Sequence, residues 1–168
     1  ESVVKKVEYA PLLTPAYQRA DWNAVLDSYR HNLPNGSFTF PVGGMKSLEF
    51  LASLSERGCF MLTADKGPNL LSSLATGDHG RLDIHGAVSA SVNFHALAQW
   101  LDSRGEVFEQ MFPYHRLNVL ALQMGNNLPD SLHAVTAFER EIVTFGPDDF
   151  ANFKDIVFQN QEVKRPTD

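Results

Sequence analysis

The fold of this chain is decided by residues 58–68, which read GCFMLTADKGP. An apolar run rises from Gly58 and stops at a polar Asp-Lys-Gly-Pro turn, a pattern typical of a buried strand of an α/β sheet followed by a loop. Ligands of open α/β sheets bind outside the carboxyl ends of the strands. Asp65, where the apolar run ends, is therefore the first candidate for a functional side chain.

Composition excludes several classes of protein. The 168 residues, 43% of them hydrophobic and 20% charged, indicate one globular domain, or one domain with a short appendage. The net charge of −6 argues against a nucleic-acid surface. A single cysteine, Cys59, excludes an internal disulfide and a Cys-rich zinc site, and it suits a reducing compartment such as the cytoplasm. No apolar run approaches the ~20 residues of a membrane helix, so we expect no membrane partner.

Hydrophobic periodicity predicts alternating helices and strands. Helices are expected at 16–31, 45–54, 92–104, 128–143 and 147–159, a loop or short helix at 69–75, and strands at 37–42, 58–64, 106–112 and 117–124. One helix between the first two strands indicates a right-handed crossover and parallel pairing. The four-residue link 113–116 forces an antiparallel hairpin. The predicted fold is an open three-layer Rossmann-like α/β sheet, mainly parallel, with a late antiparallel hairpin.

The chain divides into three segments on this pattern. Residues 1–36 form an N-terminal lead segment and helix, 37–146 form the α/β sheet region, and 147–168 form a C-terminal helix and tail. The chain begins with Glu1 rather than methionine. We therefore expect it to be a fragment of a longer protein.

Two stretches offer candidate binding residues. Asp65, Lys66 and Gly67 follow the strand, where a carboxylate can accept hydrogen bonds and a glycine lets the backbone approach a ligand. Alternatively, Asp65 only caps the next helix. The pair Gly43 and Gly44 opens a helix and could face an anion, but no nucleotide-binding glycine motif is present, and close helix packing explains the pair more simply.

The histidines are scattered rather than spaced as metal ligands, so no metal site is predicted. His85 ends a short extended piece and is expected to reach the same crevice as Asp65. Ser91 or Asn93 is expected to cap the helix that follows. The chain has no G-x-S-x-G motif for nucleophilic catalysis.

Two motifs carry a resemblance to a known family. Residues 62–67, LTADKG, resemble the strand-end Asp-x-Gly of the MidA-like group of class I S-adenosylmethionine-dependent methyltransferases. Residues 83–86, DIHG, and 89–97, SASVNFHAL, are similar to the group's short strand and its V-[DN]-F-x-x-L helix start. The order of strands from 38 to 123 resembles the C-terminal half of this fold, whose sheet finishes with an antiparallel strand returning through a hairpin.

The resemblance implies S-adenosylmethionine as cofactor and Asp65 as the catalytic carboxylate that orients a protein nitrogen. It places Lys66, Gly67 and His85 at the substrate crevice. The chain departs from the group at Lys66, where an aromatic residue is usual, and at Asn93, where an acid is frequent. Nothing before Phe38 provides the family's glycine-rich cofactor loop.

Two functions therefore remain open from the sequence. The first is part of a methyltransferase-like protein that methylates a nitrogen of a protein substrate. The second is a non-catalytic α/β module without a cofactor site, which docks on a partner or on another copy of itself. An incomplete sheet with an exposed edge favours such pairing, and aromatic residues of the C-terminal helix would contribute to the contact.

Overall fold

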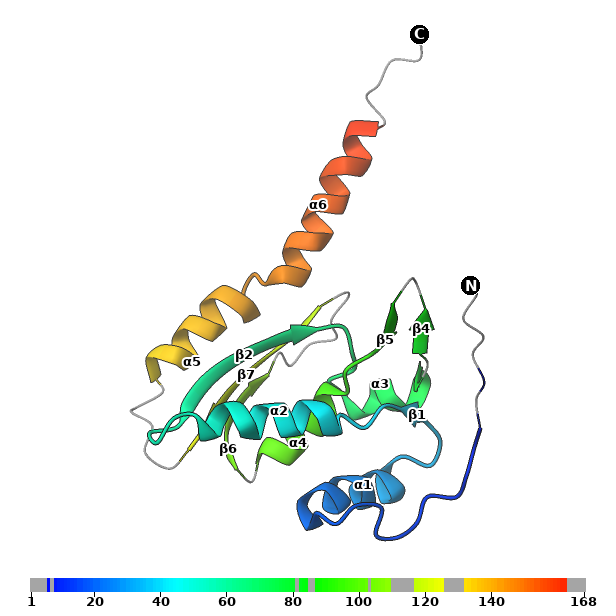
Figure 1. Cartoon of the computed structure of the whole chain (residues 1–168). Coiled ribbons are helices and arrows are strands. Elements are labelled where there is room, and N and C mark those ends of the chain that lie inside the picture. Colours follow the sequence, from blue (N-terminus) through cyan, green and yellow to red (C-terminus); the bar gives the residue numbers. More distant parts are fainter. Residues whose placement is uncertain are drawn as a thin grey trace.

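The computed structural model describes residues 6, 8–80, 82–84, 87–102, 104–109, 117–125 and 132–162, and it is a mixed α/β structure (Figure 1). The helices are α1 (Ala20–Asn32), α2 (Val42–Ser53), α3 (Leu71–Thr76), α4 (Phe94–Asp102), α5 (Leu132–Phe138), the π-helical turn η1 (Glu139–Val143) and α6 (Pro147–Glu162). The strands are β1 (Ser37–Phe38), β2 (Cys59–Asp65), β3 (Asp78–His79), β4 (Leu82–Ile84), β5 (Val88–Ala90), β6 (Gly105–Glu109) and β7 (Asn118–Met124).

The largest sheet of the described residues has the strand order β2-β7-β6. The hairpin expected late in the chain is confirmed, since β6 pairs with β7 in antiparallel register from Gly105 opposite Met124. β2 also pairs with β7 in antiparallel register, from Cys59 opposite Met124 to Asp65 opposite Asn118. β7 therefore lies between two strands that run parallel to each other.

The expected mainly parallel sheet is not found among the described residues. β1 pairs in parallel with β3 instead of β2, and the pairings of β2, β7 and β6 are all antiparallel. The expected strand at 37–42 is cut short after Phe38, because Pro41 has no backbone N–H to donate and α2 begins at Val42. A Rossmann-like three-layer sheet is thus not confirmed.

β7, rather than β2, is the buried strand of the sheet. Val119 and Ala121 face Phe138 of α5, while Leu120, Leu122 and Met124 join the main core on the other face. By contrast, burial alternates along β2, whose Phe60 and Leu62 are exposed. The expectation that residues 58–64 form a buried strand is therefore wrong: β2 lies at the edge of the sheet in the described part of the chain, and α5 covers its neighbour.

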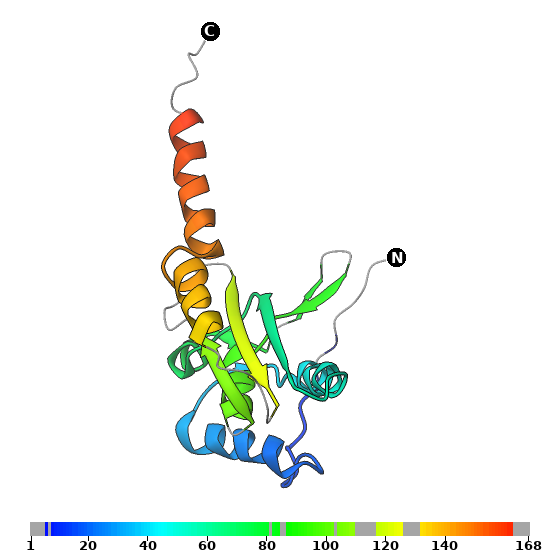
Figure 2. The ribbon, with the colours of Figure 1, turned by 90° about the vertical axis from the view of Figure 1, so that its left-hand side faces the viewer.

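The main core lies between the sheet and α4, with α1 packed against the outer side of α4 (Figure 2). α4 is amphipathic and buries Phe94, Ala96, Leu97, Trp100 and Leu101. Within the described residues, no helix has the length and apolar character that crossing a membrane requires.

An ion cluster joins the N-terminal end of α1 to α2 and to the end of α4. Arg19 donates hydrogen bonds to both carboxylate oxygens of Glu49, at 3.0 and 2.8 Å, and it also bonds Asp21. The Asp21 carboxylate accepts the indole N–H of Trp100 at 2.9 Å and a guanidinium N–H of Arg104 at 3.2 Å. Since Glu49 also pairs with Arg104 at 3.0 Å, the carboxylates of Asp21 and Glu49 together link three segments that are far apart in the sequence.

Candidate functional site

The candidate site is built on the carboxyl end of β2. Asp65 is the last residue of the strand, and its Oδ1 accepts the backbone N–H of Lys66 at 2.7 Å. Both side chains are exposed to solvent. The carboxylate thus caps the turn and remains accessible to a molecule that donates hydrogen bonds.

Gly67 fastens this turn to the N-terminal end of α4. Its φ is +156°, and a Cβ at this position would lie only 1.7 Å from the carbonyl oxygen of Val92. The carbonyl of Lys66 accepts the N–H of Val92 at 2.9 Å, and the carbonyl of Pro68 accepts the N–H of His95 at 3.1 Å. Only glycine permits this close approach of two backbones.

Asn93 caps α4, and it is one of the two residues expected from the sequence to cap this helix. Its Oδ1 accepts the N–H of Ala96 at 2.9 Å, a bond that satisfies one of the free donors in the first helical turn. The side chain is only 1% exposed, and within the described residues its Nδ2 has no hydrogen-bond partner. The Asn93 side chain therefore serves the local structure by capping α4.

Tyr29 and His95 form a hydrogen-bonded pair behind the cap, with 2.8 Å between Oη and Nδ1. Burial lowers the pKa of His95, so the imidazole is neutral at pH 7. Burial also raises the pKa of Tyr29, so the phenol keeps its proton. The Tyr29 O–H also lies 3.5 Å from Oδ1 of Asn93, to which it can donate, so the tautomer of the imidazole decides whether Oη donates to Nδ1 or accepts from it.

Two more buried amides lie next to the strand end. Asn118 is the partner of Asp65 in the β2–β7 register, and its Oδ1 accepts an amide N–H of Asn69 at 3.4 Å. Both side chains are 1% exposed. The accessible carboxylate thus lies beside a buried layer of polar side chains drawn from β7, α4 and the loop after β2.

Of the four residues predicted for the site, Asp65, Lys66 and Gly67 are consecutive at the end of β2, where Asp65 and Lys66 are exposed and Gly67 is buried against Val92. His85 lies outside the described residues. Among the residues that the structure describes, no group of three His, Cys, Asp or Glu side chains could hold a metal ion.

Sequence reasoning missed the buried partners of this site. Asn69 and Asn118 each carried one weak signal, a polar residue next to a Gly-Pro turn and a polar residue opening the apolar run of β7. Tyr29 and His95 carried no such signal in the sequence, because they meet only through the packing of α1 on α4.

Comparisons of the chain with models of protein families, with curated proteins and with solved structures found no match.

Proposed function

We propose that the chain is part of a methyltransferase-like protein that uses S-adenosylmethionine to methylate a nitrogen of a protein substrate. The observation that carries the proposal is the exposed carboxylate of Asp65 at the carboxyl end of β2, on a turn fixed to α4. In open α/β sheets ligands bind outside the carboxyl ends of parallel strands, and β2 and β6, which run parallel on either side of β7, both end at this edge.

The closing strands of the sheet support the proposal. The resemblance implies a sheet that finishes with an antiparallel strand returning through a hairpin. β7 follows β6 through such a hairpin and then runs antiparallel between β6 and β2. This order brings the end of β2 beside the start of β7, where Asp65 is opposite Asn118.

The described residues do not by themselves fit the cofactor. The glycine pair of this chain lies inside the first turn of α2, and a Cβ on Gly43 would meet nothing within 4 Å. The pair is therefore part of a helix rather than of a glycine-rich loop between a strand and a helix. In the proposed protein, S-adenosylmethionine supplies the methyl group, and this chain contributes the acceptor side of the crevice.

The part played by Asp65 is to position the acceptor. A carboxylate accepts hydrogen bonds from an amine or a guanidinium and draws such a group to the strand end by charge. Because the Gly67 backbone is held against Val92, the carboxylate has a fixed support. Holding an acceptor nitrogen in one orientation lowers the entropic cost of reaction.

Methyl transfer by the full-length protein tests this proposal. With S-adenosylmethionine labelled in its methyl group and a mixture of cellular proteins, we expect label on protein nitrogen and a rate about 100-fold lower for Asp65→Asn. Asp102→Asn, an equally conservative change at the exposed far end of α4, is the matched control and should keep the wild-type rate. The proposal fails if no label is transferred, or if Asp65→Asn is as active as the control.

A further inference from the structure

An apolar groove lies on the outer face of the sheet, away from Asp65. It has a volume of about 220 Å³ and is lined by Phe60 and Leu62 of β2 and by residues of α5 and η1, including Ile142. α5 covers β7 with Phe138 but leaves Phe60 42% and Leu62 59% exposed. The groove is therefore the part of this sheet face that the chain's own helix does not cover.

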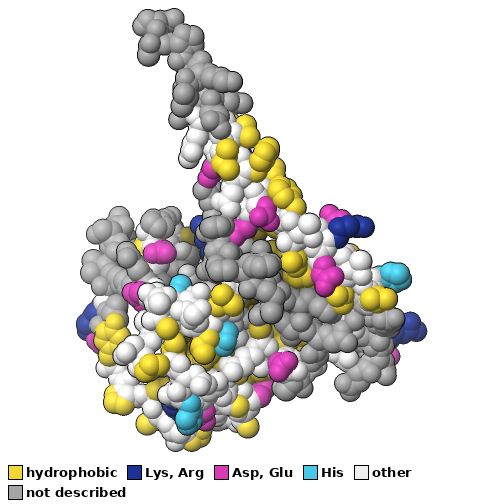
Figure 3. All heavy atoms as spheres, turned by 180° about the vertical axis from the view of Figure 1, so that it is seen from behind, with side chains coloured by type: hydrophobic (Ala, Val, Ile, Leu, Met, Phe, Trp, Pro, Cys, Tyr) yellow, Lys and Arg dark blue, Asp and Glu magenta, His cyan; other side chains and the backbone are white. Residues whose placement is uncertain are grey.

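α6 presents a second apolar surface, visible as a row of hydrophobic side chains along the helix (Figure 3). Phe150 and Phe153 are 59% and 58% exposed, and Val157 is one turn further along the same side. Within the part of the chain that the structure describes, no core buries this apolar stripe.

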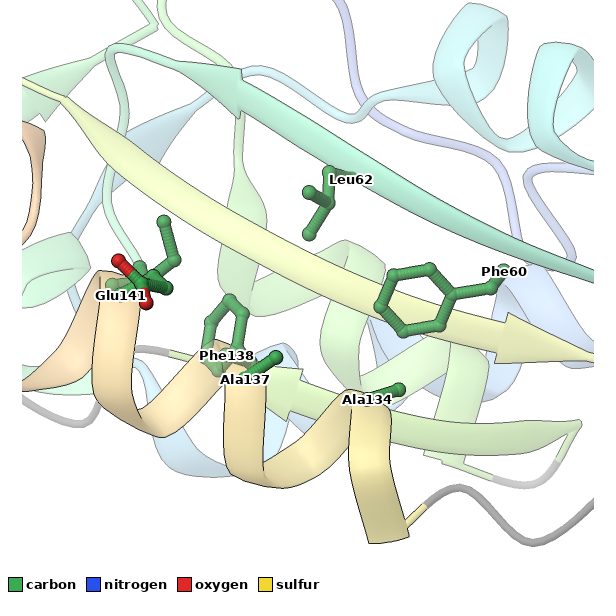
Figure 4. Close-up of a pocket in the computed structure, with 7 residues that line it drawn as sticks. Phe60, Leu62, Ala134, Ala137, Phe138 and Glu141 are labelled. Atoms are coloured by element: carbon green, nitrogen blue, oxygen red, sulfur yellow. The ribbon is translucent and has the colours of Figure 1, made fainter.

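α6 extends away from α5 and the sheet, which form the groove of its own chain (Figure 1). The first turn of α6 is anchored at the start of β7, because the carboxylate of Asp148 accepts the N–H of Leu117 at 2.9 Å. The groove lies further along the sheet, where Leu62 and Phe60 pair with Ala121 and Gln123. Figure 4 shows the two sides of the groove: the side chains of α5 point toward the sheet, and Phe60 and Leu62 extend from β2.

We propose that two copies of this chain form a symmetric dimer in which the α6 stripe of each copy occupies the groove of the other. In a two-fold symmetric dimer, the α6 stripe of each copy packs in the groove of the other. Both stripes and both grooves are then buried. The proposal develops the interaction-module alternative and does not depend on methyl transfer.

The exposed apolar area reaches the lower limit for such a dimer. Phe60 and Leu62 of the groove, Phe150 and Phe153 of the stripe, and Phe145 in the link between η1 and α6 are each roughly half exposed. At about 100 Å² each, these side chains amount to about 500 Å² on one chain and about 1,000 Å² in two copies, which is the smallest area expected of a specific interface.

Sedimentation equilibrium of the wild-type chain and four variants tests the proposal. We expect the wild type to have twice the mass of one chain at about 100 µM and to dissociate on dilution, as mass action requires. Phe153→Glu in the stripe and Leu62→Glu in the groove should each sediment as monomers. Gln159→Glu, which adds the same charge to the opposite side of α6, should remain dimeric, and so should Asp65→Asn.

Mixing the two monomeric variants distinguishes exchange from other contacts. The intact α6 of the Leu62→Glu chain can occupy the intact groove of the Phe153→Glu chain, so the equimolar mixture should regain dimer at high concentration. Circular dichroism checks that each variant keeps its helices. A monomeric wild type, a dimeric Phe153→Glu variant, or a mixture that stays monomeric would overturn the proposal. Since methyl transfer is assayed separately with Asp65→Asn, failure of one proposal is distinguishable from failure of the other.

Discussion

Replacing Gly67 by alanine is expected to lower the free energy of unfolding by more than about 4 kcal/mol, the range of the most severe single substitutions. The added Cβ would lie 1.7 Å from the Val92 carbonyl oxygen, 2.6 Å from its carbonyl carbon and 2.8 Å from its nitrogen. These are backbone atoms, so no side-chain rotation relieves the overlap. The turn and α4 must separate, which breaks the hydrogen bonds of Lys66 to Val92 and of Pro68 to His95.

Urea unfolding of Gly67→Ala and of a matched control checks this expectation. Gly43→Ala makes the same change inside α2, where the new Cβ meets nothing within 4 Å. Because alanine favours the helix over glycine, we expect that control to gain about 0.5–1 kcal/mol. A Gly67→Ala variant as stable as the wild type would show that the turn is not held against α4 in this way.

Asp21→Asn is expected to cost about 3 kcal/mol at pH 7, because the amide cannot replace a charged acceptor of several hydrogen bonds. The hydrogen bond from Arg19, followed by that from Trp100, holds the pKa of Asp21 well below its usual range and outweighs the opposing effect of burial. An asparagine would also direct its own N–H donors toward the donors of Arg19, Trp100 or Arg104.

The loss at Asp21 should depend on pH in a defined direction. Its carboxyl has a lower pKa in the folded than in the unfolded chain, where the ordinary value is 3.8. Its contribution is therefore complete above about pH 5 and declines as the pH falls through the lowered pKa. The difference in unfolding free energy between wild type and Asp21→Asn should shrink from pH 5 toward pH 2.

Asp27→Asn in the same helix is the control for Asp21. Asp27 pairs with Arg30, and its side chain is 49% exposed, so we expect a loss of at most about 0.5 kcal/mol at any of these pH values. Equal losses for the two variants would contradict the role assigned to the ion cluster.

The sequence predicted most of the local structure because that structure follows from nearby residues. The apolar spacing in α4 and the run in β7 indicated a helix and a strand close to those observed, and the short link before β7 identified the hairpin. Asn93 was foreseen as a cap because capping is a local requirement of the helix.

Strand pairing could not be predicted in the same way. The run at β2 is apolar on both of its faces, so its composition does not distinguish a central strand from an edge strand with a bare outer face. Pairing with β7 depends on residues more than fifty positions away. The expected crossover therefore assigned β1 to the wrong partner.

The residues of the candidate site also differ in whether local sequence could predict them. Asp65 and Gly67 were accessible to sequence reasoning because a polar turn after an apolar strand has a known place in α/β sheets. The buried amides of Asn69 and Asn118 were not, since their contact follows from the unexpected β2–β7 register.

The central claim is that Asp65 presents its carboxylate to a cationic nitrogen of a protein substrate. Its most direct test is a titration of the ¹⁵N-labelled chain with a short peptide carrying one arginine, compared with the same peptide carrying citrulline, which has a similar shape but no charge. We predict that the amide signals of Lys66 and Gly67 move and saturate with the arginine peptide alone, and that Asp65→Asn abolishes the movement. Unmoved signals at both residues, or equal movement with both peptides, would contradict the claim.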